Sequence, residues 1–223
     1  MFPLLLAAAC QTLPPGDSAV LAETVPAAAV LPADAARYVV DPQVSEVRLL
    51  VYRDGPLARF GHNHVIVGRI EGEVRAGASA AASGFSLRIA VDSFVIDPPD
   101  ARAEEGAEFS AEVSEPARRA TRENMLGPEV LDAGNFPLVR IDSIALAGPP
   151  WNPTVTARVA LRGVTRDLRF TAAVFEHEAT LTVIASLRIR HSDFGIAPFI
   201  ALGGGLRVHD AIDLRLRLLA RRH

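Results

Sequence analysis

Two histidines, His62 and His64, stand at the beginning of a run that alternates between apolar and polar residues. Side chains two positions apart in an extended strand point to the same face, and here that face carries both histidines with Ile66 and Ile70. An imidazole can ligate a metal, exchange a proton near neutral pH or hydrogen-bond to a bound molecule. We therefore expect any chemistry of this chain to lie at the start of this strand.

A third histidine lies in phase with a second apolar row. His191 continues the inward face of a predicted strand that carries Leu181, Val183, Ala185, Leu187 and Ile189. His209, by contrast, is in phase with Arg207 and Asp213 on the polar side of the last predicted strand, so we expect it to point outward. Parity therefore predicts that three imidazoles face the interior.

Three roles are open for His62, His64 and His191. They could hydrogen-bond to loop backbone at a rim, bind the polar head group of a ligand, or hold a divalent metal or haem. Arg59, with Arg53 and Arg190, is a further candidate for head-group binding. No nucleophile–histidine–acid order, phosphate-binding glycine loop or metalloprotease helix is present, so the sequence predicts no enzymatic activity.

The elements that must position these residues read as β-strands. Val47, Leu49 and Val51 alternate with more polar residues, and the same pattern recurs in residues 85–92, 155–161, 168–174, 181–189 and 206–218. Repeated strands with one apolar and one wet face predict an antiparallel barrel or sandwich rather than a βαβ fold. The 223 residues suffice for one such domain.

One segment interrupts this rhythm. Residues 97–115 contain seven acidic residues and a single basic one, Arg102. We expect an acidic, partly helical loop with a solvated surface, followed by a short helix that packs through Met125 and Leu126. The formal net charge of the whole chain is only −3, which gives no electrostatic footprint for nucleic acid.

The N-terminal region predicts export. Residues 1–10 hold a short apolar run that ends at Cys10, the only cysteine, and resemble the end of a bacterial lipoprotein or secretory signal. Residues 11–36 are rich in alanine and proline and suggest a flexible tether. We therefore expect a protein of the periplasm or cell envelope, bound to a membrane through a lipid anchor if Cys10 is acylated.

Several short tracts, in order, resemble one bacterial family. Tyr38-Val39-Val40-Asp41-Pro42 with Ser45-Glu46-Val47, Arg122-Glu123-Asn124-Met125-Leu126, Leu161-Arg162-Gly163-Val164-Thr165-Arg166 and Ile189-Arg190-His191-Ser192-Asp193-Phe194-Gly195-Ile196 are similar to motifs of the YceI-like periplasmic, lipocalin-like barrels. This chain departs from that pattern at His62-Asn63-His64, at His191, where the family motif has arginine, and in the acidic loop. The resemblance covers residues 37–223.

The resemblance implies an eight-stranded antiparallel barrel that encloses an elongated apolar cavity and binds an isoprenoid or other long-chain lipid. We therefore predict a non-catalytic lipid carrier without a cofactor, and a divalent metal or haem protein using His62, His64 and His191 as the alternative. The ligand-binding residues expected in the carrier are the three histidines and Arg59 at the mouth and, along the lumen, Ile66, Ile70, Leu87, Ile89, Leu187 and Leu214, with Val47 and Leu49.

Overall fold

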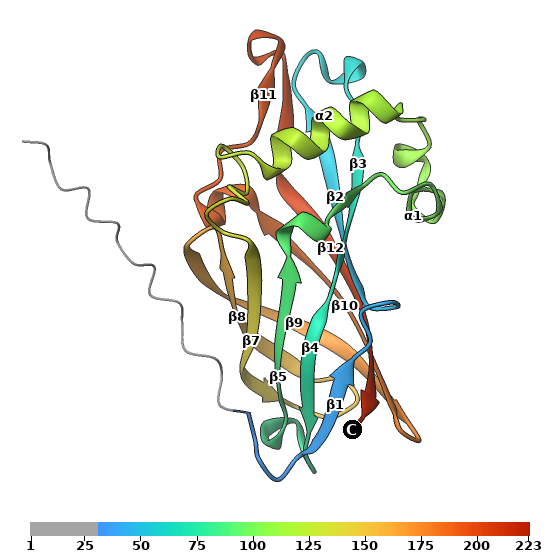
Figure 1. The fold of residues 1–223 in the computed structure, drawn as a ribbon, viewed down its shortest axis with the longest axis vertical. Helices are drawn as coiled ribbons and strands as arrows, with labels where there is room; N and C mark the ends of the chain where they lie inside the picture. The colour runs from blue at the N-terminus through green and yellow to red at the C-terminus, as the bar shows by residue number, and fades with distance from the viewer. Residues whose placement is uncertain (1–30) are drawn as a thin grey trace, which may run out of the picture.

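The computed structural model describes residues 31–223 and consists mainly of antiparallel β-strands (Figure 1). Cys10, the expected signal and most of the expected tether lie outside the described residues. The strands are β1 (Ala36–Val40), β2 (Glu46–Asp54), β3 (His64–Arg69), β4 (Glu71–Ala76), β5 (Gly84–Ala90), β6 (Val95–Ile96), β7 (Leu138–Ala147), β8 (Thr154–Leu161), β9 (Val164–His177), β10 (Thr180–Arg190), β11 (Ile200–Ala201) and β12 (Leu206–Arg222). The two α-helices are α1 (Pro99–Ala103) and α2 (Glu115–Leu126).

Eight strands close into a ring, as predicted. The ring runs β1, β4, β5, β7, β8, β9, β10 and β12, and it closes because β1 pairs with both β4 and β12. In the upper half of the barrel in Figure 1, β2 and β3 take the places of β1 and β4. Every pairing is antiparallel, and the strands of the ring contribute apolar residues to a common interior.

The alternation suggested that the run beginning with His62 is one strand, but the structure divides it into two. It breaks at Ile70 into β3, which pairs with β2 and β6, and β4, which pairs with β1 and β5. The same alternate positions face the interior on both sides of the break, since Ile66, Ile70 and Val74 all pack in the interior cluster. Beyond the break, Gly72 adopts a φ of +135°, and an added Cβ there would lie 2.2 Å from the carbonyl oxygen of Ser86.

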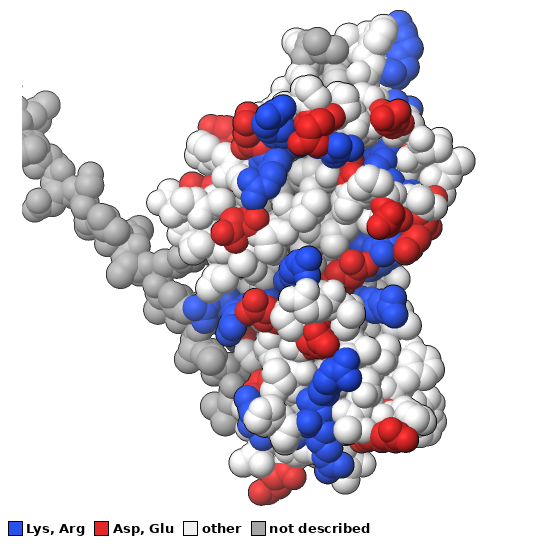
Figure 2. Space-filling view, turned by 45° about the vertical axis from the view of Figure 1, so that its right-hand side comes forward, with Lys and Arg blue, Asp and Glu red and all other residues white. Residues whose placement is uncertain are grey.

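The composition of the acidic segment suggested a solvated surface, but part of the segment is buried. Ala101 of α1 and Phe109 pack against Leu50 and Val65 on the outer face of β2 and β3 and form a second small core. Two of the acids, Asp97 and Glu105, have side chains that are at most 1 % exposed. On the face in view in Figure 2, basic and acidic side chains are intermixed.

The helix α2 lies across the upper end of the barrel (Figure 1). It begins after Ser114, has a proline in its first turn and ends at Leu126, before Gly127. Ala117, Thr121 and Met125 recur at a spacing of four residues and face a cavity below the helix. The predicted short helix is thus present, and it forms part of the cavity wall.

Candidate functional site

The interior of the barrel contains a series of cavities along its axis. A middle cavity of about 160 Å³ lies between an upper cavity of about 300 Å³ and a lower one of about 130 Å³. The middle and upper cavities share the walls formed by Val51, Ile66 and His191, and the middle and lower ones share Ile141 and Leu216. The adjoining cavities form an elongated space suited to a long, narrow ligand.

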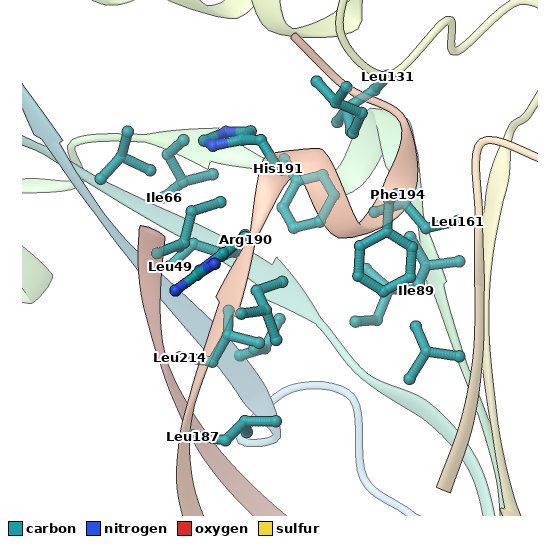
Figure 3. Close-up of a pocket in the computed structure, with 18 of the residues that line it drawn as sticks. Leu49, Ile66, Ile89, Leu131, Leu161, Leu187, Arg190, His191, Phe194 and Leu214 are labelled. Atoms are coloured by element: carbon teal, nitrogen blue, oxygen red, sulfur yellow. The ribbon is translucent and has the colours of Figure 1, made fainter. Parts of the chain in front are cut away.

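Aliphatic and aromatic side chains line the middle cavity. Figure 3 shows Leu49, Leu187 and Leu214 directed toward this space, with His191 at its upper end and Phe194 beside it. Most of the sequence-predicted lumen residues lie on this wall, namely Val47, Leu49, Ile66, Ile89, Leu187 and Leu214. Leu87 lines the lower cavity, and Ile70 is fully buried in the surrounding core. Such a wall can hold an apolar chain but offers it few directional bonds.

The structure brings His62, His64 and His191 together around the upper cavity. The ring centroids of His62 and His64 lie 6.4 Å apart. His191 borders both the upper and the middle cavity, where the polar end of the space meets its apolar part. Asn124 of α2 lines the same cavity. His209 is exposed, as its phase on the last strand predicted.

His64 is held by a buried ionic cluster. Its Nδ1 lies 2.6 Å from Oδ2 of Asp97, a carboxylate that is completely buried. The other oxygen of Asp97 accepts hydrogen bonds from the backbone N–H of Val65, at 2.8 Å, and from the guanidinium of Arg102. Arg102 also donates to the carbonyl oxygens of Asn63 and Phe109. Arg102 therefore connects the acidic segment to the strand that bears the histidine.

The ionised form of Asp97 is favoured in this cluster. Burial alone would raise its pKa, but hydrogen bonds and the charges of its partners outweigh that effect and leave the pKa of Asp97 below its ordinary value. The backbone at Asp97 has a φ of +51°, which asparagine and aspartate tolerate better than other residues with a side chain. The carboxylate is thus held as an acceptor at one fixed position behind His64.

His191 is positioned by a short 3₁₀ turn, His191–Phe194, that follows β10. Its Nδ1 lies 3.1 Å from the carbonyl oxygen of Asp210 on β12. The carboxylate of Asp193 accepts a hydrogen bond from the backbone N–H of Arg190, Phe194 is 1 % exposed, and Gly195 ends the turn with a φ of +67°. These three residues therefore shape the turn that directs His191 to the cavity.

Two of the three imidazoles are shifted toward the neutral form. Burial lowers the pKa of His191 below its ordinary value of 6.5. Burial, followed by the nearby His64, also lowers the pKa of His62. At neutral pH both rings are therefore uncharged, so the cavity offers an anion less positive charge than three histidines suggest.

The arginines expected at the mouth differ in their placement. Arg53 lines the upper cavity, and its guanidinium donates to the carbonyl oxygen of Gly61. Arg59 is exposed, and its guanidinium lies 4.4 Å from the centroid of the Phe60 ring, a cation–π contact on the rim. Arg190 is also largely exposed. Of these three, Arg53 lines the upper cavity with the histidines, and Arg190 lines the middle cavity beside His191 (Figure 3).

The alternative of a metal site has little geometric support. Among residues 31–223, no group of three or more histidine, cysteine, aspartate or glutamate side chains is arranged to hold a metal ion. The three histidines therefore surround a common space without converging on one point. No helix in this part of the chain is long and apolar enough to span a membrane.

Sequence reasoning did not identify several residues of the site. Asp97 and Arg102 belong to the acidic segment, and nothing in their spacing indicates the contact with His64, more than thirty positions away in the chain. The exposed apolar rim was also missed: Phe60, Phe199 and Ile200 are 61 %, 43 % and 61 % exposed, and the first two line the upper cavity. The Pro98-Pro99 pair directly after Asp97 was the available signal of a fixed turn.

Comparisons with known proteins agree with this architecture. A solved structure of BcnA from Burkholderia cenocepacia has a similar fold, with a TM-score of 0.59 and 17 % identity over 81 % of this chain and 98 % of that one. A polyisoprenoid-binding domain from Saccharophagus degradans gives a TM-score of 0.53 with 13 % identity, over 83 % of this chain and 98 % of that one. The YceI protein of Campylobacter jejuni gives 0.51 with 13 % identity, over 69 % and 81 %.

Curated protein sequences contain no significant match to this chain. The YceI-like domain, however, matches residues 38–220, from within β1 to within β12, and so includes nearly all of the barrel and the histidine-lined cavity. The same match covers the motifs on which the resemblance was based. The chain belongs to the YceI-like family.

Proposed function

We propose that this protein is a non-catalytic carrier that holds an isoprenoid or other long-chain lipid in the barrel, with its polar head in the upper cavity. The observation that carries the proposal is the elongated apolar interior that meets three histidines at one end. A structural neighbour is described as a polyisoprenoid-binding domain, which supports this ligand class.

The physical basis is the burial of an apolar tail. Each methylene group transferred from water to the lumen contributes about 0.8 kcal/mol, without any need for directional bonds. A polar head needs hydrogen-bond partners, since its desolvation otherwise offsets part of this gain. The upper cavity supplies such partners, whereas the middle cavity has almost none.

Obstruction of the lumen tests the proposal. Leu187→Trp places a large ring in the middle cavity, and Ser186→Trp, on the same strand but exposed, is the matched control. We expect the lumen variant to lose binding of a fluorescent prenyl lipid by at least about tenfold, as expected when a tail loses about 1.4 kcal/mol or more of burial. The control should bind like the unmodified protein. Equal binding by all three proteins would place the lipid outside the barrel.

The proposal extends to export and anchoring. We propose that residues 1–10 direct the chain out of the cytoplasm and that Cys10 is acylated, so that the carrier works at a membrane of the cell envelope. Cells fed labelled palmitate should incorporate the label into the protein, and Cys10→Ser should abolish incorporation. Unlabelled protein that remains in the cytoplasm would contradict this part of the proposal.

A further inference from the structure

The hydrogen bonds behind His64 determine which of its nitrogens carries a proton. A carboxylate can only accept hydrogen bonds, so the 2.6 Å contact with Asp97 requires a proton on Nδ1 of His64. The charge of Asp97 is already balanced by Arg102, whose side chain is only 10 % exposed. With its proton on Nδ1, the neutral ring has Nε2 as its acceptor atom.

His191 is fixed in the same tautomer by a different partner. The carbonyl oxygen of Asp210 can only accept a hydrogen bond, so Nδ1 of His191 is also the protonated nitrogen. The ring is uncharged at neutral pH because burial lowers its pKa. His191 therefore presents a bare Nε2 lone pair.

The Nε2 atoms of His64 and His191 remain available to a ligand. Within residues 31–223 the hydrogen bonds of these rings to Asp97 and Asp210 are made by Nδ1, and neither Nε2 is among the buried polar atoms without a partner. Both atoms are thus accessible, and both residues line the upper cavity. Within residues 31–223 no hydrogen bond fixes the tautomer of His62, so this ring can act as a donor or as an acceptor toward a head group.

The basic residues near this cavity are largely engaged elsewhere. Arg102 is paired with Asp97, Arg207 lies 2.8 Å from a carboxylate oxygen of Asp54, and Arg53 donates to Gly61. The cavity thus has two acceptor nitrogens, and among residues 31–223 Arg53 is the one lining arginine without a carboxylate partner. This is a poorer site for a carboxylate or diphosphate, which brings only acceptors and negative charge. It is a good site for a group that donates a hydrogen bond.

We propose that the upper cavity selects lipids whose head is an uncharged hydroxyl group, such as a prenyl alcohol or a prenylated hydroquinone, by accepting its proton in a hydrogen bond at Nε2 of His64 or His191. This inference rests on the proposed lipid-carrier function and names the class of head group. It specifies the chemistry of the head-group role that the sequence left open for these histidines.

The direct test compares ligands with one tail and different heads. Geranylgeraniol, its methyl ether and its diphosphate are titrated against the full chain at about pH 8, where an imidazole of ordinary pKa is uncharged. We expect the alcohol to bind about five- to tenfold more tightly than the ether, as for one net hydrogen bond, and more tightly than the diphosphate. Equal affinity for alcohol and ether, or preference for the diphosphate, overturns the inference while leaving a lipid carrier intact. No binding of any of the three refutes the carrier function itself.

Two variants locate the selectivity. In Asp97→Asn the amide can donate to Nδ1 of His64, which moves the proton to Nε2 and turns the acceptor into a donor. We expect this variant to bind the ether nearly as well as the alcohol. His191→Phe removes the other acceptor and leaves the buried ionic cluster unchanged, so it reports on selectivity if the first variant does not fold. Unchanged alcohol-to-ether ratios in both variants contradict the assignment.

The tautomers are also measurable without any ligand. Protein labelled with ¹⁵N-histidine, with signals assigned through single His→Gln variants, should show protonated Nδ1 and unprotonated Nε2 for His64 and His191 at about pH 8. Protonated Nε2 atoms on both rings would overturn the inference independently of lipid binding.

Discussion

Removal of the Asp97 side chain should strongly destabilise this domain. The Asp97→Ala substitution removes a fully buried carboxylate that accepts from His64, Val65 and Arg102 at once. It leaves the Arg102 guanidinium, with a side chain only 10 % exposed, without its countercharge. The backbone N–H of the fully buried Val65 loses its acceptor as well.

The expected loss follows from these contacts. Breaking a buried ion pair on one side destabilises a protein by about 3–5 kcal/mol, since the remaining charge is uncompensated. The orphaned N–H would add about 1–3 kcal/mol if it were independent. The carbonyl oxygens of Asn63 and Phe109, which also accept from Arg102, offset part of this sum. We therefore expect a decrease in the free energy of unfolding of about 4 kcal/mol.

Urea unfolding followed by circular dichroism measures this decrease, with the m-value as a check that the transition stays two-state. Asp97→Asn distinguishes the effect of the backbone conformation from that of the lost charge, because asparagine tolerates the positive φ. This variant should therefore lose less free energy of unfolding than Asp97→Ala. Asp167→Ala, which removes an exposed partner of Arg158, is the matched control and should change little. A loss below about 1 kcal/mol for Asp97→Ala, with an unchanged m-value, would refute the structural role assigned to the cluster.

Three further outcomes are expected. The pKa values of His62 and His191 are lowered in the folded state, so the stability that their neutral forms contribute is present above their ordinary value of 6.5 and is lost as the pH falls below it. Thermal unfolding followed between about pH 8 and pH 5.5 should show this loss of stability. The loss should be smaller in the His191→Phe variant. Gly72→Ala should destabilise the fold by about 2 kcal/mol or more in urea, because a Cβ would meet the Ser86 carbonyl at 2.2 Å and the φ of +135° is strained for alanine; a neutral effect would contradict this geometry. Phe194→Ala should cost about 3–5 kcal/mol, because the ring is 1 % exposed, and an effect as small as that of a surface substitution would show that the turn below His191 is not packed as described.

The interior face of the barrel was predictable because a strand has a period of two. Alternation alone placed Leu187, Leu214 and Ile66 on the lumen wall. It also predicted the outward position of His209 despite an irregularity in β12, where the residues from Val208 to Ile212 face a shorter stretch of β2. The register moves by an even number of residues there, so the phase is unchanged on both sides.

The partners of the histidines were not predictable in this way. His64 depends on Asp97, which reaches it through the pairing of β3 with β6, a contact between segments distant in sequence. The break at Ile70 results from the exchange of strand neighbours, which local alternation does not record. The hydrogen-bonding capacity of the histidines at the mouth could therefore not be predicted from the sequence, because it depends on which nitrogen of each ring is already bonded.

The most direct test of the carrier function is the dependence of affinity on tail length. Delipidated protein is titrated with farnesol, geranylgeraniol and solanesol, which share one head and differ only in their prenyl tails. We expect affinity to increase by about fourfold for each added methylene equivalent until the lumen is full, in line with about 0.8 kcal/mol of burial per group, and then to level off. Affinities that do not change from farnesol to geranylgeraniol would show that the tail lies outside the barrel and would contradict the central claim.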